Sequence, residues 1–385
     1  MIELQSDSII FNFPEIRARM LARAHAWIDA HVALATIEEK SRLPDSRETL
    51  YSEFERFIPE IRASISLQRT LRIPDDGNDY PLPPGLGRFP LHHVDDFPHA
   101  PEAWKKRGGV MVPMHKAEAL WLHFSTDYPM ALKVGAGGIC AISGEQWSTS
   151  LHTSPQNYAV LPEQPWLDGF RIGEGVIRQF VAAPLGTGLT VEQQIKGEET
   201  WGGLQLQAFP LAVEKYDFSL MDAFFLATWE KLIRPPIREH LSSFSRVARA
   251  SPMAMAPMTG AGLGAGGRIR QKIAADSRGP RSWDSATTSR CFVHLCLAED
   301  WKRLTGTQPP QKPPTAADYT KAGLPWFDFD SWELSVAGDS KLSVVKSVGN
   351  LLEEKIGSDL PDNETLSPSN VVQVRPRPSG IVREF

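Results

Sequence analysis

Tryptophan and carboxyl side chains occur together at two places in the sequence, in a combination typical of sites for sugar-like ligands. The segments 165–168 (PWLD) and 325–328 (PWFD) repeat one pattern. Indole faces stack on sugar rings, carboxylates bind hydroxyl groups, and a carboxylate pair can perform acid–base chemistry on a glycosidic bond. Asp168 and Asp328 are therefore candidate catalytic residues, and Trp166 and Trp326 are candidate ligand-binding residues. The alternative is that the tryptophans pack in the core and each acid caps a turn.

A glycine-rich stretch followed by arginines forms a second candidate site. The segment 262–267 (GLGAGG) matches the spacing GxGxxG, and residues 268–290 contain six basic and two acidic side chains. Glycine amides beside arginines suit a phosphate or carboxylate group. The candidate ligand-binding residues are Gly264, Gly266, Gly267, Arg268 and Arg270. No β-branched strand precedes the glycines, which disfavours a dinucleotide site. The alternative is a flexible glycine loop whose arginines are solvated or paired with acids.

Other groups that could do chemistry fit weaker patterns. The segment 92–96 (HHVDD) makes His93 and Asp96 weak candidate metal ligands, although a site would need further ligands from elsewhere. Cys291 and Cys296 stand among apolar residues, as core thiols do, and Cys140 lies in an apolar run where burial makes a thiol inert. No GxSxG motif occurs. We therefore expect no bound metal and no cofactor.

Length and composition exclude several classes of protein. The chain has 385 residues, with 41 basic and 46 acidic side chains and 42% hydrophobic residues. A chain of this length can bury about three quarters of its unfolded surface, so it needs no disulfide or metal to fold. Nucleic-acid binders usually carry a basic excess, which is absent here. Three cysteines fit a reducing compartment, and we expect a soluble, cytoplasmic protein. The uncharged stretch 250–267 is interrupted by prolines and glycines, so we expect no membrane span.

The hydrophobic pattern predicts an α+β protein with a central antiparallel β-sandwich or barrel-like domain. Residues 1–62 have helical periodicity and form a helical N-terminal segment. Residues 63–212 form a β-rich core domain, because short alternating or apolar runs are separated by turn residues. The strand candidates are 64–73, 109–113, 119–124, 131–134, 138–142, 158–161, 176–182, 189–195 and 204–209.

Residues 213–357 are predicted to form a mixed helical and β segment packed on this core. Helices are expected within 217–249, split by Pro235 and Pro236, and at 315–322 and 341–356, with a buried strand at 291–297 leading into a helix near 299–304. Residues 358–385 are predicted to be an extended tail. Because Val371, Val372 and Val374 alternate in part, this tail can dock as a strand.

Several longer motifs resemble a family of uncharacterised bacterial and fungal proteins, some of which are labelled integral membrane proteins. The motifs are QRTLRIPDDG, YPLPPGLGRFP, PWLDG, EGVIRQFVAAPLG, LTVEQQ, GAGGRIRQKI and AGLPWFDFD. The resemblance covers about residues 68–350 and the tail, and several motifs in one order make it fairly specific. It implies no known activity, fold or catalytic residue. Its membrane label conflicts with the hydropathy, which favours a protein without a span.

Two functional interpretations remain open. The first is a soluble interaction or assembly protein that forms a homo-oligomer or binds a protein partner, because no complete catalytic signature is present. The second is an enzyme or carrier for a small anionic or sugar-like ligand, bound through residues 260–290 and the acids of the two PW-x-D segments. Association of the 224–229 helix with a lipid surface is disfavoured because the chain is acidic. Neither nucleic acid nor a membrane is expected as a partner.

Overall fold

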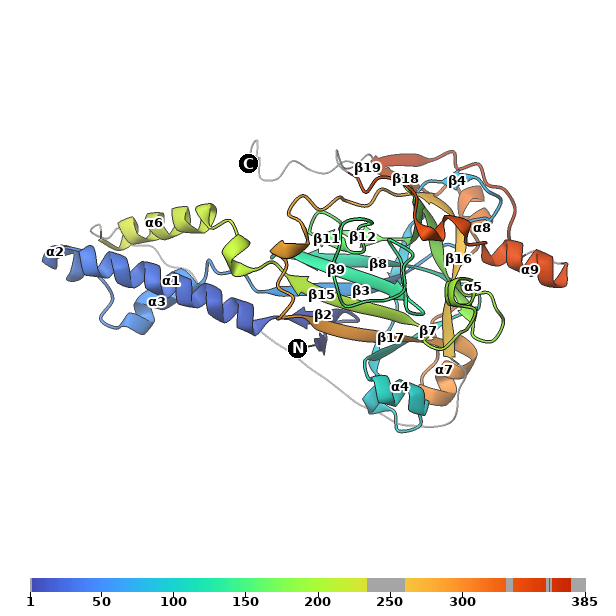
Figure 1. The fold of residues 1–385 in the computed structure, drawn as a ribbon, viewed down its shortest axis with the longest axis horizontal. Coiled ribbons are helices and arrows are strands. Elements are labelled where there is room, and N and C mark those ends of the chain that lie inside the picture. The colour runs from blue at the N-terminus through green and yellow to red at the C-terminus, as the bar shows by residue number, and fades with distance from the viewer. Residues whose placement is uncertain (1, 234–259, 330–334, 358–359, 361, 375–385) are drawn as a thin grey trace.

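The body of the protein is one large sheet of mainly antiparallel strands, with helices at its ends and margins (Figure 1). The structure, a computed structural model, describes residues 2–233, 260–329, 335–357, 360 and 362–374. Within these residues, seventeen strands are connected in the large sheet and two more form a small separate sheet. The chain is a mixed helix-and-strand protein with a β-rich centre, as the sequence predicts.

The strands of the large sheet include most of those that the sequence predicts between residues 63 and 212. They are β1 (Ile2–Leu4), β2 (Ile9–Asn12), β3 (Arg62–Thr70), β4 (Asp79–Tyr80), β5 (Gly85–Arg88), β6 (His92–His93), β7 (Val110–Met114), β8 (Ala119–Thr126), β9 (Met130–Ala136), β10 (Ile139–Cys140), β11 (Ala159–Leu161), β12 (Trp166–Leu167), β13 (Gly169–Gly173), β14 (Val176–Pro184), β15 (Leu204–Pro210), β16 (Gly260–Arg270) and β17 (Ser289–Leu297). β3 pairs with β8, β9 with β15 and β14 with β16, all antiparallel. β4–β16 and β7–β17 are parallel pairs. The expected sandwich or barrel stays a prediction, because no sheet closes on itself within the described residues.

Helices extend the sheet at one end and cover parts of its margin. Those in the described residues are α1 (Pro14–Leu34), α2 (Ile37–Lys40), α3 (Arg47–Glu55), α4 (Glu102–Arg107), α5 (Val191–Lys196), α6 (Ser219–Ile233), α7 (Ala298–Thr305), α8 (Ala316–Lys321) and α9 (Val348–Ile356). We call α1, α3 and α6, which project together from the sheet in Figure 1, the helical arm. Aromatic side chains pack together inside the arm. The centroid of the Phe225 ring lies 5.4 Å from that of Trp27 and 5.3 Å from that of Phe54. The second helix predicted within 217–249, after Pro236, lies outside the described residues.

The glycine-rich segment is a strand, so the expectation of a flexible loop there is wrong. β16 pairs with β14 from Ala183↔Gly262 to Arg178↔Arg268. A Cβ atom at Gly264 would overlap the Val348 side chain, and one at Gly267 would overlap the Pro74 carbonyl oxygen. The glycines therefore let neighbouring backbone and side chains approach β16 closely. Periodicity could not reveal this strand because glycine adds no apolar alternation.

Three further elements differ from the sequence predictions. The strand expected at 189–195 is wrong: Thr190 caps α5 by accepting a hydrogen bond from the Gln193 N–H, and Gly197 ends it at φ +78°. The single helix expected over 341–356 is a 3₁₀ turn at Lys341–Val344 followed by α9. The N-terminal segment is not helical throughout, because β2 pairs with β3 in the large sheet.

The tail docks as a strand, as its alternating valines predict. β19 (Val371–Val374) pairs in parallel with β18 (Trp326–Phe329) and forms the small second sheet. The Asn370 carbonyl also accepts a hydrogen bond from the Trp326 N–H at 2.8 Å. The tail therefore supports the edge of β18.

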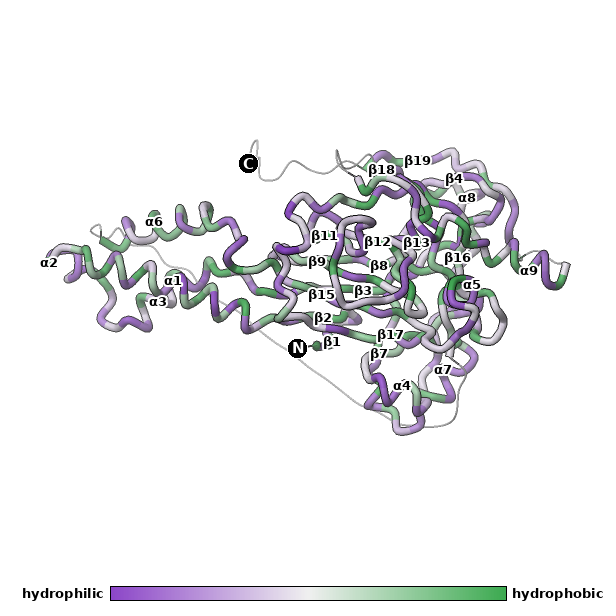
Figure 2. The backbone as a smooth tube through the Cα atoms, viewed as in Figure 1, coloured by the Kyte–Doolittle hydropathy of each residue, from purple (hydrophilic) through white to green (hydrophobic). Residues whose placement is uncertain are grey.

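A single main hydrophobic core joins the sheet to the helical arm. Its buried residues run from Ile9 on β2 through Ile16 on α1 to Phe225 on α6 and Leu295 on β17. Figure 2 shows hydrophobic stretches recurring along the strands of the body. Among the helices of the described residues, none is both long enough and apolar enough to cross a membrane.

Candidate functional site

The two PW-x-D segments, far apart in the sequence, meet at one cavity on the sheet. This cavity has a volume of about 390 Å³. It is lined by Leu82, Pro83, Gly85, Trp121, His123, Pro165, Trp166, Asp168 and Phe327. The first segment supplies three of these residues and the second supplies Phe327. We call it the aromatic cavity.

Strand alternation puts the aromatic and polar side chains on the same face. Trp121 and His123 are two residues apart on β8, so their side chains point to one side of the sheet. β12 pairs with β8 so that Trp166 lies opposite His123, and Asp168 follows two residues later. The sheet thus presents two indoles, an imidazole and a carboxyl side by side.

β18 closes the cavity from the other side. Phe327 and Leu82 exchange two backbone hydrogen bonds, with N···O distances of 2.7 and 2.9 Å. Phe329 shares the strand face of Phe327, and its ring meets Trp166 edge-on at 4.8 Å. This contact joins the first PW-x-D segment to the residue that follows the second. The cavity wall is therefore aromatic on both sides.

Asp168 is the carboxyl group of the aromatic cavity, and it is almost fully buried. Only 4% of the residue is exposed. Its Oδ2 accepts a hydrogen bond from Gln271 Nε2 at 2.8 Å, and its backbone N–H donates to Gln271 Oε1 at 3.1 Å. Burial raises the pKa of Asp168 to about 7, although hydrogen bonds from Trp166 and Gln271 act in the opposite direction. Near neutral pH a large share of this carboxyl is protonated and can donate a hydrogen bond.

His123 is the second titratable group of the aromatic cavity. Burial lowers the pKa of His123, and the positive charge of Arg88 lowers it further. The imidazole is therefore neutral at pH 7, with one nitrogen that donates and one that accepts. Both titratable groups of the cavity shift toward their neutral forms, which suits an uncharged ligand.

The remaining PW-x-D residues lie outside the aromatic cavity. Trp326 is fully buried beside Tyr80 and Tyr319, and its Nε1 donates to Thr320 Oγ1 at 3.2 Å. Asp328 lies on the same strand face as Trp326 and forms an ion pair with Arg270 at 3.4 Å. The structure thus brings Trp166 and Asp168 to one cavity and gives Trp326 and Asp328 contacts elsewhere.

The glycines and arginines of the second candidate site also have partners within the fold. Gly264, Gly266 and Gly267 are internal residues of β16, packed against neighbouring segments. Arg268 forms an ion pair with Asp79 at 2.7 Å. Arg270 likewise forms an ion pair with Asp328. Both arginines are thus paired with acids, as the alternative to an anion-binding site predicts. Anion binding here stays a prediction.

The candidate metal ligands lie on a short strand and the turn after it. His93 ends β6, and Asp96 ends a 3₁₀ turn at Val94–Asp96. The neighbouring His92 packs against the rings of Phe97 and Trp301 at 5.5 and 5.2 Å. Within the described residues, no group of three or more His, Cys, Asp or Glu side chains is arranged to hold a metal ion.

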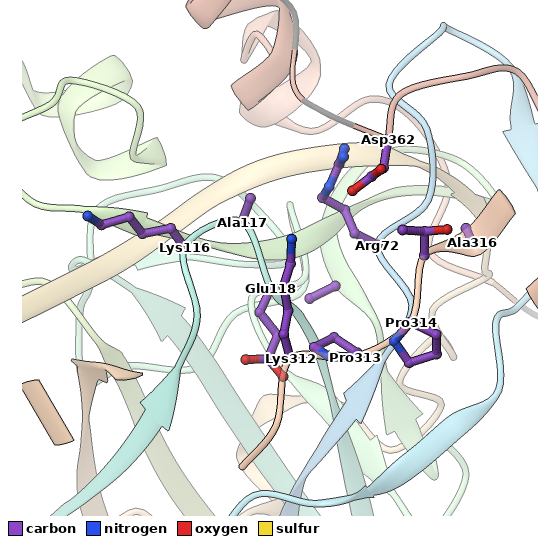
Figure 3. Close-up of a pocket in the computed structure, with 11 residues that line it drawn as sticks. Arg72, Lys116, Ala117, Glu118, Lys312, Pro313, Pro314, Ala316 and Asp362 are labelled. Atoms are coloured by element: carbon purple, nitrogen blue, oxygen red, sulfur yellow. The ribbon is translucent and has the colours of Figure 1, made fainter. Parts of the chain in front are cut away.

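A second, smaller cavity lies beside the proline-rich segment that precedes α8 (Figure 3). Its volume is about 70 Å³, which is room for a few water molecules or a small ion. Arg72, Lys116 and Lys312 surround it, and Figure 3 shows Lys116 directed away from the other two. Lys116 pairs with Glu299 at 3.0 Å, and Asp362 adds a carboxylate to the lining. Because acids offset these cations, the aromatic cavity is the better candidate site.

Comparisons with known protein families, with curated proteins and with solved structures gave no match to this chain. The site therefore rests on geometry alone. The sequence pattern indicates Trp166 and Asp168 but gives no sign of two other residues of the site. Gln271 hydrogen-bonds to Asp168, and Phe327 lines the same cavity. The signal for Trp121 and His123 was present, because the predicted strand at 119–124 places both side chains on one face.

Proposed function

We propose that the aromatic cavity binds a small uncharged ligand with a flat, largely apolar face and hydroxyl or carbonyl groups, as a sugar-like molecule has. Trp121, Trp166 and Phe327 offer ring faces and edges for such a ligand. No lysine or arginine is among the described residues that line the cavity, so a charged ligand would find no counter-charge there. The neutral groups of His123 and Asp168 supply hydrogen bonds that orient the ligand.

The observation that carries this proposal is the burial of Asp168 beside the cavity with no ion-pair partner in the part of the chain that the structure describes. An ionised carboxylate in an apolar site is costly unless it is paired, so the protonated form is favoured. A protonated carboxyl can donate a hydrogen bond to a hydroxyl or carbonyl oxygen of the ligand. A fully apolar molecule would make no use of this hydrogen-bonding group, which Gln271 already contacts from the protein side.

Binding fits the cavity better than glycoside hydrolysis. Hydrolysis of a glycosidic bond generally requires two carboxyl groups about 5–10 Å apart on either side of the bond. Asp168 is the one carboxyl among the described residues that line the cavity, because Asp328 pairs with Arg270. We therefore propose a carrier or sensor role for this cavity.

Calorimetric titration of the full chain tests this proposal. The probes are methyl and phenyl glycosides of common hexoses, with phenol and cyclohexanol as ring compounds that are not sugars. We expect saturable binding of at least one probe, weakened about tenfold or more by Trp166→Ala and by Asp168→Ala, which corresponds to at least about 1.4 kcal/mol.

The matched control is Trp201→Phe, which changes an exposed tryptophan outside the cavity and should leave the affinity unchanged. Absence of binding at millimolar concentrations of every probe would refute the proposal. Equal affinity of wild type and both cavity variants, measured on folded protein, would do the same.

We also propose that the helical arm mediates association with a second copy of the chain. The arm and its tip expose the large apolar side chains Leu34, Ile37, Leu220, Phe224 and Leu226. Leu220 and Phe224 are one turn apart on α6 and therefore neighbours on its surface, where one side of the Phe224 ring stacks on Phe57. Grouped apolar side chains on a projecting surface favour burial against a partner, and an identical arm offers the same chemistry.

Light scattering coupled to size-exclusion chromatography checks this second proposal. We expect a defined oligomer that Leu220→Lys combined with Leu226→Lys converts to the monomer. Leu324→Lys, at an exposed leucine outside the arm, should leave the oligomer intact. A wild-type monomer at micromolar concentration would contradict the proposal.

A further inference from the structure

A buried lysine lies on β9, outside the set of residues that line the aromatic cavity. Lys133 on β9 is only 1% exposed. Its Nζ donates to the Ser150 carbonyl oxygen at 2.7 Å and lies 3.4 Å from Ser148 Oγ. Within the described residues, no carboxylate forms an ion pair with it. A buried ammonium without a counter-ion is unusual because it loses its hydration.

The segment 141–158 folds back over the sheet and brings serine hydroxyls to this amine. The Trp147 ring lies over Lys133 Nζ at 5.4 Å. The indole fits there because residue 135 of β9 is a glycine. A Cβ atom at Gly135 would lie 2.5 Å from Trp147 Cε3. Asn157 Nδ2 holds the Ser150 carbonyl at 3.0 Å, which anchors the segment. The position of the serines over Lys133 is therefore built into the fold.

Ser148 and Ser150 continue the hydrogen-bonding chain from Lys133 toward solvent. Their Oγ atoms lie 3.3 Å apart, Ser148 is half-buried and Ser150 is exposed. Gln207 lies on β15, directly opposite Lys133 on the paired strand β9. Its buried Oε1 accepts no hydrogen bond within the described residues. A buried amide oxygen without a donor is uncommon in folded proteins. It offers an acceptor for a polar hydrogen beside the amine.

We propose that Lys133 and Ser148 form a base–nucleophile pair that transfers acyl groups from small uncharged esters or amides. Ser148 Oγ attacks the acyl carbon while its proton moves to Lys133 Nζ, and the leaving alkoxide or amine then takes that proton. Water attacks the acyl-serine, passes one proton to Nζ and releases the carboxylic acid, and Nζ returns the proton to Oγ. This activity is independent of ligand binding in the aromatic cavity.

The electrostatics of Lys133 support the role of base. Burial lowers the pKa of Lys133, while the neighbouring Cys140 and Glu145 raise it by a smaller amount. Glu145 is occupied by His152 at 3.2 Å and by Lys341 at 3.3 Å, which limits its effect on Lys133. A lysine that gives up its proton more readily can accept one from a serine hydroxyl.

The experiment exposes the full chain to an alkyl fluorophosphonate, which forms an Oγ–P bond with an activated serine and releases fluoride. We expect the adduct on Ser148, located by peptide mass spectrometry, and no adduct there in Ser148→Ala. Lys133→Met should slow labelling by about 10²–10⁴-fold, the usual contribution of a general base. The same variants should lose a corresponding share of p-nitrophenyl acetate hydrolysis.

Two controls separate a catalytic role from a structural one. Lys341→Met removes a lysine that contacts the same segment through Glu145, and it should label at the wild-type rate. Lys133→Arg keeps a cation but cannot act as base, so it should remain unlabelled even where its circular dichroism and melting curve match the wild type. Labelling of the wild type should rise with pH and level off below the range of an ordinary lysine. Absence of label on Ser148, or equal rates in wild type and folded Lys133 variants, would overturn the proposal.

Discussion

Two buried carboxyl groups in this protein, Glu192 and Asp168, have opposite surroundings. Glu192 on α5 is 1% exposed and accepts hydrogen bonds from Lys196 Nζ at 2.7 Å and from the N–H groups of Trp201 and Gly202 at 2.9 and 2.8 Å. Asp168 is nearly as buried, yet its carboxylate has Gln271 and Trp166 as partners and pairs with no cation of the described residues. The first group is bound by a cation and by backbone N–H groups, and these contacts stabilise the fold. Asp168 has a pKa raised to about 7 and lines a cavity. The number and charge of the hydrogen-bonding partners therefore distinguish the structural acid from the candidate functional acid.

The largest effect is expected from removing the structural acid. Glu192→Ala removes the carboxylate partner of Lys196, whose Nζ keeps the Gly137 carbonyl oxygen at 3.0 Å, and takes away the acceptor of the Trp201 and Gly202 N–H groups. Loss of one partner of a buried pair costs about 3–5 kcal/mol, and we expect a decrease of that size in the free energy of unfolding. Urea denaturation measures it, with Glu198→Ala as a surface control in the same segment. A decrease below about 1 kcal/mol would show that Glu192 is not the structural acid described above.

A pH-dependent effect is expected from the acid of the aromatic cavity. The folded-state pKa of Asp168, about 7, lies above its ordinary value near 3.8, so the folded state binds the proton more tightly than the unfolded state. Its contribution to stability is therefore present below pH 4 and is lost as the pH rises to 7, by up to about 4 kcal/mol. Asp168→Asn should match the wild type at low pH and become more stable than it above pH 7. Parallel stability–pH curves for the two proteins would contradict this assignment.

The smallest effect is expected from the amide that holds Asp168. Gln271 donates to the carboxylate and thereby lowers the pKa of Asp168. Gln271→Ala should reduce stability by about 1–2 kcal/mol, the typical loss for a hydrogen bond to a charged or buried group, and move the titration of Asp168 to higher pH. NMR titration of the carboxyl carbon checks the direction. Gln373→Ala, which removes an exposed amide near Asp328, is the matched control and should change neither quantity.

The sequence predicts much of the body of the fold because alternation is a local signal. The candidates at 119–124 and 204–209 are strands β8 and β15, and the valines of the tail form β19 as expected. α5 was missed because the run Leu189-Thr190-Val191 resembles a strand. Its capping threonine and the glycine at its end were the signals that identify a helix there.

The candidate sites depended on contacts that local patterns do not contain. Trp166 and Asp168 were singled out by their spacing, but Phe327 and Gln271 reach them only through the pairing of distant strands. Trp326 has the same sequence signature as Trp166 and is fully buried, since its side of β18 faces the core. The pairing of Lys133 with Ser148 arises from the path of segment 141–158, and hydropathy gives no indication of that path.

The aromatic cavity draws its walls from parts of the chain that are synthesised at very different times. Leu82, Trp121 and Trp166 leave the ribosome well before Phe327 and the strand β19 that supports it. A nascent chain thus carries less covered indoles until β18 and β19 have been made, and exposed apolar surfaces of this kind are prone to association. The wall of the aromatic cavity is therefore completed only after Phe327 has been made.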